Sequence, residues 1–307
     1  MNSGPAGSVQ GGMALIPALA CVALTTVLST GCELAAEGSG PAASGSFDRT
    51  LQVNGPVTLS VTNGSGDVTI VPGQDGSVHV VGRIRASASL LGGLGGATAD
   101  DKIQKLSANP PIVQEGSRIR IGEITDQSLR NGVTITYEIA VPVATQLKSR
   151  VGSGNETVGA IAGPVDVTSG SGDLKIGPVQ SGATLSTGSG DIMLLGASGE
   201  IAMKTGSGDV KADHVRGHVT AKTGSGSITL DGQPDRDWTI TAASGDVNLR
   251  LPSDARFSLD AHTASGDVQV QHALDNVQRT RHQVSGTANG GGARVAITTA
   301  SGSVSVR

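Results

Sequence analysis

Hydrophobic and polar residues alternate along most of the chain after residue 47, and a fixed period organises the alternation. Apolar residues placed 18 positions apart form five columns. The columns are Val165, Ala183, Ile201 and Val219; Val167, Leu185, Met203 and Ala221; Leu174, Ile192, Val210 and Ile228; Ile176, Leu194, Ala212 and Leu230; and Val179, Ala197 and Val215. Thr, Ser, Lys and Asp separate the columns, which is the period of two expected of strands with one buried face.

A short polar triplet, Ser-Gly followed by Asp, Asn or Ser, recurs with the same period. Its nine copies begin at Ser65, Ser153, Ser171, Ser189, Ser207, Ser225, Ser244, Ser265 and Ser301. From Ser153 onward the steps are 18, 18, 18, 18, 19, 21 and 36 residues, and we interpret the last step as two repeats with one degenerate copy. Glycine adopts positive φ easily, and Ser or Asp can bond nearby backbone, so each triplet predicts a tight turn between strands.

The two patterns together predict an all-β fold, a single-stranded β-solenoid with 18-residue rungs. One rung cannot bury its apolar face alone, but stacked rungs join the columns into a continuous core and pair each strand with its neighbours. We expect a right-handed β-helix. A β-sandwich is the main alternative, although a sandwich has no reason to keep strict register at this period.

The solenoid is expected to span residues 47–307, with the regular array at 151–307 and an early copy of the rung around Ser65. Residues 86–130 break the pattern and are predicted to form an insert or cap at the N-terminal end, because an open solenoid end exposes unpaired backbone. Within them, Thr98 is a candidate N-cap for a short helix whose apolar residues are Ile103 and Leu106.

Composition indicates which side chains fill the core and which class of partner is not expected. The chain has 46 glycines and only four aromatic residues, so small aliphatic side chains must fill a narrow interior. Its net charge of −4 comes from interspersed acids and bases, without a basic stripe for phosphates. Nucleic acid is therefore not an expected partner.

The N-terminal segment predicts export. Met13–Leu28 carries no charge and has the length of a signal-peptide apolar region. Ser-Thr-Gly-Cys follows, which resembles a bacterial lipoprotein signal: residues 1–31 would be removed and Cys32 would become the acylated first residue. Residues 32–46, rich in Gly, Ala and Ser, would form a flexible linker. An ordinary secretory signal and an uncleaved anchor are the alternatives.

The expected location is accordingly the cell envelope, with a membrane contact through the lipid anchor. Glu33, rather than Asp, follows the cysteine, which favours the outer membrane if the cell has two membranes. Otherwise the protein is expected to be periplasmic or extracellular. Both cysteines, Cys21 and Cys32, lie near the N-terminus, so no disulfide framework holds the repeats.

Stacking would align Asp173, Asp191 and Asp209 along one corner of the solenoid. Such a row of carboxylates suggests calcium binding as in nonapeptide β-rolls, which place two acidic motifs in each coil. Here each rung offers one acid, and Ser227 and Ser303 replace it in two copies. We therefore favour a structural role for the row, expect no metal or cofactor, and keep a cation ladder as the alternative.

Catalysis on a polysaccharide would need a cluster of acids and bases that breaks the repeat. The one such cluster is Asp235–Trp238, where Trp238 falls at an inward column and is predicted to be core. The Gly-Ser-Gly runs lack the spacing of a serine-hydrolase nucleophile elbow. The sequence thus predicts no catalytic residues and a non-enzymatic protein.

The run "VTSGSGDLKI", "LSTGSGDIML" and "MKTGSGDVKA", with "LSVTNGSGDVTI" upstream, resembles a broad bacterial family of β-strand-repeat proteins known as putative adhesins. The resemblance covers residues 47–307 and implies a β-helix in the envelope, with no defined activity. This chain departs from the pattern at Glu156, which occupies an inward column, and in the degenerate copy around residues 274–294.

The leading expectation for function is a surface or periplasmic scaffold that contacts an unknown protein partner. A glycan-binding adhesin is the runner-up, and the shortage of aromatic rings stands against it. A third alternative is end-to-end self-association, because the chain ends at Val304–Arg307 within a predicted strand, and an uncovered last rung could pair with another chain.

Overall fold

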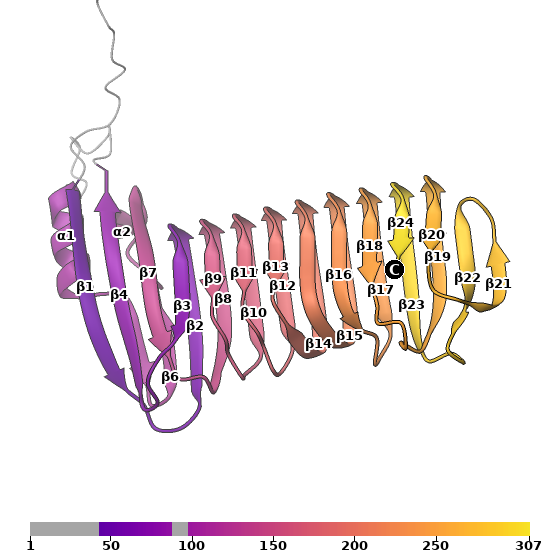
Figure 1. Ribbon diagram of the computed structural model, residues 1–307. Coiled ribbons are helices and arrows are strands. Elements are labelled where there is room, and N and C mark those ends of the chain that lie inside the picture. The colour runs from indigo at the N-terminus through magenta and orange to yellow at the C-terminus, as the bar shows by residue number, and fades with distance from the viewer. Residues whose placement is uncertain (1–42, 88–97) are drawn as a thin grey trace, which may run out of the picture. The chain divides into compact units, whose positions relative to one another are not determined.

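The computed structural model describes residues 43–87 and 98–307, and residues 39–307 form one compact unit. In the described residues this unit is all-β apart from two short helices, with strands stacked side by side (Figure 1). Strand β1 begins at Ala43, so strand structure starts before the expected boundary at Phe47 and takes in the end of the expected linker. The predicted signal peptide, 1–31, and linker residues 32–42 lie outside the described residues.

The elements fall into three consecutive groups. The N-terminal group is β1 (Ala43–Gln52), β2 (Val57–Ser65), β3 (Val68–Pro72), β4 (Ser77–Ala86), α1 (Ala99–Ala108), β5 (Ile112–Glu115), β6 (Arg118–Ile121), α2 (Gln127–Arg130) and β7 (Val133–Val141). The repeat array is β8 (Thr145–Ser153), β9 (Glu156–Val158), β10 (Val165–Ser171), β11 (Leu174–Ile176), β12 (Ala183–Ser189), β13 (Ile192–Leu194), β14 (Ala197–Ser207), β15 (Val210–Ser225), β16 (Ile228–Gln233), β17 (Trp238–Ser244) and β18 (Val247–Arg250). The C-terminal group is β19 (Phe257–Ser265), β20 (Val268–Val270), β21 (Asp275–Arg279), β22 (Gln283–Ala288), β23 (Ala293–Ser301) and β24 (Val304–Val306).

Successive repeats in the array pair in parallel and in register. Val165 of β10 pairs with Leu147 of β8 on one side and with Ala183 of β12 on the other, and Ala183 pairs in turn with Ile201 of β14. The apolar columns identified from the sequence all face inward and are buried. The chain therefore forms a β-solenoid-like repeat with one continuous aliphatic core, as the hydrophobic pattern predicts.

A third inward position on the long strand is polar in most rungs, with Val151 and Ala242 as apolar exceptions. Thr187, Thr205 and Thr223 are buried there, directly before the Gly-Ser-Gly corner. The alternation of inward and outward positions does not by itself explain why a hydroxyl is buried. An unpaired polar group in a core is destabilising, so each hydroxyl needs a hydrogen-bond partner. These hydroxyls are paired with the corner backbone, and their partners define the corner geometry described below.

The N-terminal end of the stack is covered by strands from the region that breaks the repeat. The early rung of β2 and β3 pairs with β8 and β9 on one side and with β6 and β7 on the other. Strands β4 and β1 then continue antiparallel from β7. Helix α1 contacts both strands and has the predicted Thr98 N-cap, with a reciprocal bond between Thr98 and Asp101. The strands that cover this end thus include β1, β4 and β7, and residues 88–97 of the predicted cap lie outside the described residues.

The C-terminal end differs from the sequence prediction. Strand β24 pairs with β18 on one side and β20 on the other, and β23 lies likewise between β17 and β19. The last rung in the sequence is therefore inserted next to last in space. Figure 1 shows this yellow rung inside the stack. The prediction of an uncovered rung at Val304–Arg307 is wrong.

The 36-residue step between Ser265 and Ser301 has a matching explanation. It contains a β-hairpin, β21 and β22, whose strand β22 pairs antiparallel with β19 and covers the outer side of that rung. The step is therefore a cap followed by a returning rung, and the interpretation as two stacked repeats is wrong. Strand β21, at the outside, is exposed along its whole length and carries Asp275 and Arg279, which discourages pairing with another chain.

The inserted rung predicts a large effect at Val306, which is fully buried between two neighbouring strands. We expect Val306→Lys to lower the free energy of unfolding by about 3 kcal/mol or more, because it places an unpaired charge in the core. Ser305→Lys, whose side chain points outward on the same strand, should change it by less than about 0.5 kcal/mol. Thermal unfolding followed by circular dichroism measures both. Equal melting temperatures for the two variants would contradict the inserted position.

Candidate functional site

The Ser-Gly-Asp corners are the most repeated polar feature of the chain, and the structure brings them into one line. Ser65, Ser153 and Ser171 are partners in adjacent strands. The order continues through Ser189, Ser207, Ser225, Ser244, Ser301 and Ser265. In each corner the second glycine has positive φ, 138° at Gly172, and a Cβ atom there would collide with the carbonyl oxygen of Gly154 in the preceding rung. Only glycine fits this position.

At several corners a Thr and an Asp side chain replace the backbone bonds that the corner interrupts. The Thr187 hydroxyl donates to the Gly172 carbonyl of the preceding rung at 3.1 Å. The Asp191 N–H donates to Oδ1 of Asp173 at 2.9 Å, and the Asp209 N–H donates to Oδ1 of Asp191 at 2.8 Å. The repeated Thr and Asp therefore satisfy backbone groups that would otherwise lack a partner.

This pairing gives the aspartate row a structural role, the interpretation that the sequence favours. Asp173, Asp191 and Asp209 do lie in one column, as predicted, and each commits one carboxylate oxygen to the next rung. Within residues 43–87 and 98–307, no group of three His, Cys, Asp or Glu side chains is arranged to hold a metal ion. The row has a structural explanation that needs no cation.

The corner bonds predict a graded response to substitution at Asp191. Asp191→Ala removes the acceptor for the Asp209 N–H, and we expect a loss of about 1 kcal/mol in unfolding free energy. Asp191→Asn should lose less than half of that, because an amide oxygen still accepts, as Asn155 already does from the Asp173 N–H at 3.0 Å. The measurement is urea unfolding, with exposed Lys175→Ala as the control. A saturable rise in melting temperature with calcium would instead support the cation ladder.

The cluster at Asp235–Trp238 makes structural contacts. Trp238 is fully buried, as predicted, and its indole N–H donates to the Gly217 carbonyl at 3.0 Å. Asp237 accepts the Arg294 N–H at 2.9 Å and so ties the inserted C-terminal rung to the array. These contacts account for the Trp and one of the acids structurally.

Glu156 is the clearest departure from the repeat, and the structure places it in the core. Its side chain occupies the inward column between Val68 and Leu174 and is 1% exposed. Neither carboxylate oxygen has a hydrogen-bond partner. Burial raises the pKa of Glu156 to about 7, and the nearby Ser149 hydroxyl offsets only part of this shift. The acid is thus held protonated at mildly acidic pH.

The raised pKa makes stability depend on pH in a defined direction. The unfolded chain ionises Glu156 near its ordinary value of 4.5 and the folded chain near 7, so the folded state is favoured below 4.5 and loses that advantage as pH rises to 7. Above pH 7 we expect Glu156→Leu to be more stable than the parent by on the order of 3 kcal/mol. The gain should shrink toward pH 4.5. Exposed Glu200→Gln is the control, and a gain that is constant with pH would contradict the assignment.

A cleft of about 660 Å³ lies where the N-terminal cap meets the first rungs. Strands β2, β7 and β8 form its floor, and the segment from Gly122 to Val133, which contains α2, forms a wall. These elements lie together near the N-terminal end of the stack in Figure 1. Gly122 has positive φ and packs against the Thr62 carbonyl of β2 with no space for a Cβ, which sets where the wall leaves the sheet.

The lining of the cleft combines apolar side chains with a few polar groups. Ile135, Tyr137 and Val151 are buried in the floor, and Ile124 and Val133 are half-buried in the wall. The Tyr137 hydroxyl is buried without a hydrogen-bond partner, and burial raises the pKa of Tyr137 above its usual range. A large apolar pocket with a few convergent polar groups is the usual form of a small-molecule site.

This cleft was not predicted from the sequence, where residues 86–130 were expected to form an insert or cap. One signal was present: at the Thr position before the corner, the rungs that border the cleft carry Asn63 and Val151. Asn63 donates to the carbonyls of Gly66 and Ile135, both at 2.8 Å, so it joins the first rung to the cap.

The lipidation site predicted at Cys32 lies outside the described residues. Across the residues that the structure describes, neither helix has the length and hydrophobicity of a membrane span.

Comparison with protein families gives a match over residues 112–307 to the model named Toastrack DUF4097. The chain belongs to the Toastrack DUF4097 family. The match begins at the first residue of β5 and includes the cleft wall, the repeat array and the C-terminal insertion. In this Toastrack protein, β1 to β4 and α1 precede the matched range.

Solved structures that resemble this Toastrack chain are distant in sequence. A "putative adhesin" from Bacteroides fragilis NCTC 9343 is 12% identical, with a TM-score of 0.44 over 86% of this chain and 97% of that one. A "putative lipid binding protein" from Parabacteroides distasonis ATCC 8503 is 12% identical, with a TM-score of 0.38 over 85% and 96%. A "putative cell adhesion protein" from Clostridium sporogenes ATCC 15579 is 10% identical, with a TM-score of 0.22 over 86% and 99%. No curated protein matches the sequence significantly.

Proposed function

We propose that this protein is a non-enzymatic scaffold of the bacterial cell envelope, anchored by a lipid on Cys32, whose solenoid surface binds another protein. The names of its structural neighbours, which include an adhesin and a cell adhesion protein, agree with a binding role at a surface. We further propose a right-handed coil, since parallel crossover connections are right-handed in about 98% of cases.

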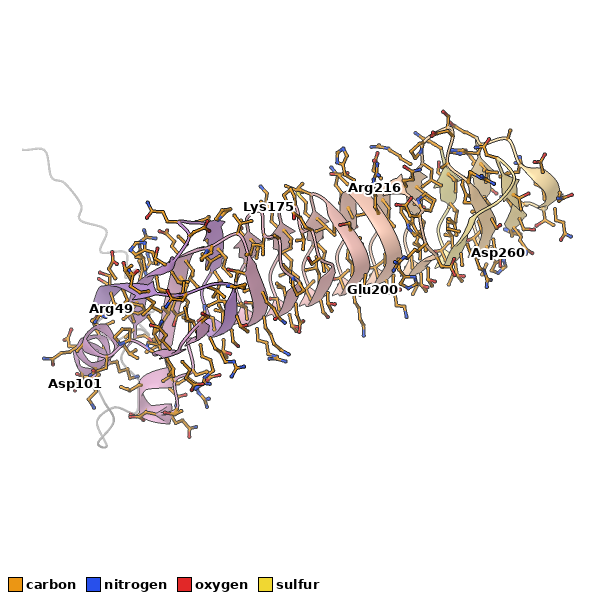
Figure 2. The ribbon with its side chains drawn as sticks, turned by 90° about the horizontal axis from the view of Figure 1, so that it is seen from below. Arg49, Asp101, Lys175, Glu200, Arg216 and Asp260 are labelled. Carbon is orange, nitrogen blue, oxygen red and sulfur yellow. The ribbon has the colours of Figure 1, made fainter. Side chains whose placement is uncertain are left out.

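The observation that carries the proposal is the regular outward face of the long strands. One outward column contains Arg150, Thr168, Ser186, Lys204, Lys222, Thr241, Thr298 and His262, one residue from each successive rung. Such residues repeat about every 4.8 Å and form a flat, polar, partly basic surface. Figure 2 shows charged side chains, among them Lys175, Glu200 and Arg216, projecting from the strands. A rigid face of this kind suits an extended protein contact.

A strict glycan-binding role is less well supported. The aromatic residues of the chain, Phe47, Tyr137, Trp238 and Phe257, are each at most 4% exposed. Sugar sites commonly stack a ring of the ligand on an exposed aromatic face, and these four rings are in the core instead. End-to-end polymerisation through the last rung also loses its basis, because that rung is inserted between two others.

The proposal predicts the fate of the Cys32→Ser variant in cells that export the protein. The parent should fractionate with membranes and show, by intact mass, a chain that begins at Cys32 and carries a diacylglyceryl-type addition. Cys32→Ser should be released in soluble form, because it lacks the lipidated thiol. A soluble, unmodified parent would contradict the anchor.

The same cells test the binding face. A photo-crosslinking residue at Ser186 or Thr241, two members of the outward column, should give the same discrete adduct, and one at Gln278 of the terminal hairpin should not. Adducts should weaken in the Cys32→Ser background, where the protein is released. Absence of adducts from both column positions would contradict a protein contact on this face, whatever the result for the anchor.

A further inference from the structure

The cleft between the cap and the first rungs has features that the scaffold role does not require. A solenoid cap needs only to cover backbone, yet the segment from Gly122 to Val133 encloses a cleft of about 660 Å³ together with β2 and β8. Volumes of roughly 300–1,000 Å³ are typical of small-molecule sites. The cap therefore provides both closure and a cavity of ligand size.

The floor of the cleft is rigid and mainly apolar. Tyr137 is fully buried and packs edge-on against Phe47, with ring centroids 6.2 Å apart. Phe47 in turn lies directly over Gly82, where a Cβ would collide with its ring. Ile135 and Val151 complete the floor. These contacts fix the tyrosine ring in place and leave an apolar surface for a hydrocarbon group.

The Tyr137 hydroxyl supplies a polar group that the protein itself leaves unpaired. The hydroxyl is buried and makes no hydrogen bond, and Tyr137 is one of the residues that line the cleft. Leaving a buried hydroxyl unpaired is unfavourable, and phenylalanine would fill the same space without that penalty. A ligand atom that accepts a hydrogen bond would satisfy this hydroxyl.

The charges at the cleft favour an anion. Arg130 from α2 and Arg150 from β8 line it, and within the described residues neither forms an ion pair. The lining contains one acid, Glu123, which lies 3.7 Å from the Arg120 guanidinium, and Arg120 also pairs with Glu115 at 3.1 Å. The lining itself therefore carries two arginines and one glutamate. The balance around the opening is positive.

We propose that this cleft binds a single-chain amphiphile with an anionic head group, of which a fatty acid is the simplest example. The hydrocarbon chain would cover Ile124, Val133 and Ile135. The head group would lie against Arg130 and Arg150, and an acceptor oxygen would take the Tyr137 hydroxyl bond. The inference rests on the cleft alone and stands whether or not the outward face binds a protein.

The test is a titration with cis-parinaric acid, a fluorescent fatty acid, on the chain released from cells as the Cys32→Ser variant, which avoids detergent. We expect saturable binding near one molecule per chain. Arg130→Glu with Arg150→Glu should weaken binding at least about tenfold. Arg216→Glu, a surface charge on β15 away from the cleft lining, is the matched control and should leave binding unchanged.

Tyr137→Phe separates a ligand role from a structural one. It preserves the ring packing, so the melting temperature should hold or rise, while fatty-acid affinity should fall several-fold. A neutral chain, decanol, should compete much less well than decanoate. Absence of saturable binding, equal binding by the double arginine variant, or equal competition by decanol and decanoate would each overturn the proposal.

Discussion

The structure depends on backbone hydrogen bonds that join each rung to the next and stay in register through the corners. Within the strands these bonds follow from β geometry, but a sharp corner takes an amide and a carbonyl out of the ladder. The repeat supplies a carboxylate for the Asp191 N–H and a hydroxyl for the Gly172 carbonyl, in both cases across neighbouring rungs. The backbone groups of a corner therefore find hydrogen-bond partners only when another rung is stacked next to it. The same motif, Thr-Gly-Ser-Gly-Asp, therefore forms the corner and joins it to the adjacent rung.

This dependence explains why so much of the array could be predicted from sequence. Inward columns such as Val165, Ala183 and Ile201 repeat because each residue contacts its own equivalents, so a local pattern reports a long-range contact. The early rung around Ser65 could be recognised on the same grounds. The period carries no information on the order of rungs in space. Parallel pairing in register allows the rung of β23 and β24 to stand in either place, and contacts such as Asp237 with Arg294, 57 residues apart, decide it.

The two ends of the stack are closed by strands that lie outside the repeat. Each end lacks a neighbouring rung, and each is closed by antiparallel strands that do not follow the repeat: β4 and β1 at one end, β22 and β21 at the other. Strand β1 is further covered by α1, whose Ser107 carbonyl accepts from Arg49 at 3.4 Å. Placing a regular rung next to last keeps the chain terminus paired on both sides.

Side chains that serve a ligand can occur where the repeat is interrupted. In a repeat, every inward position must suit its equivalents above and below, so a group that serves a ligand has no place there. Glu156 shows what happens when one appears: the next strands offer no partner, and its carboxylate is left buried among Val68 and Leu174. At the cap, β7 and the segment after Gly122 have an adjacent rung on one side only. Their residues therefore need not fit equivalent residues on the other side. Tyr137 and its unpaired hydroxyl occur at that boundary. The cleft that Tyr137 lines could therefore not be predicted from the repeat period, which determines most of the fold.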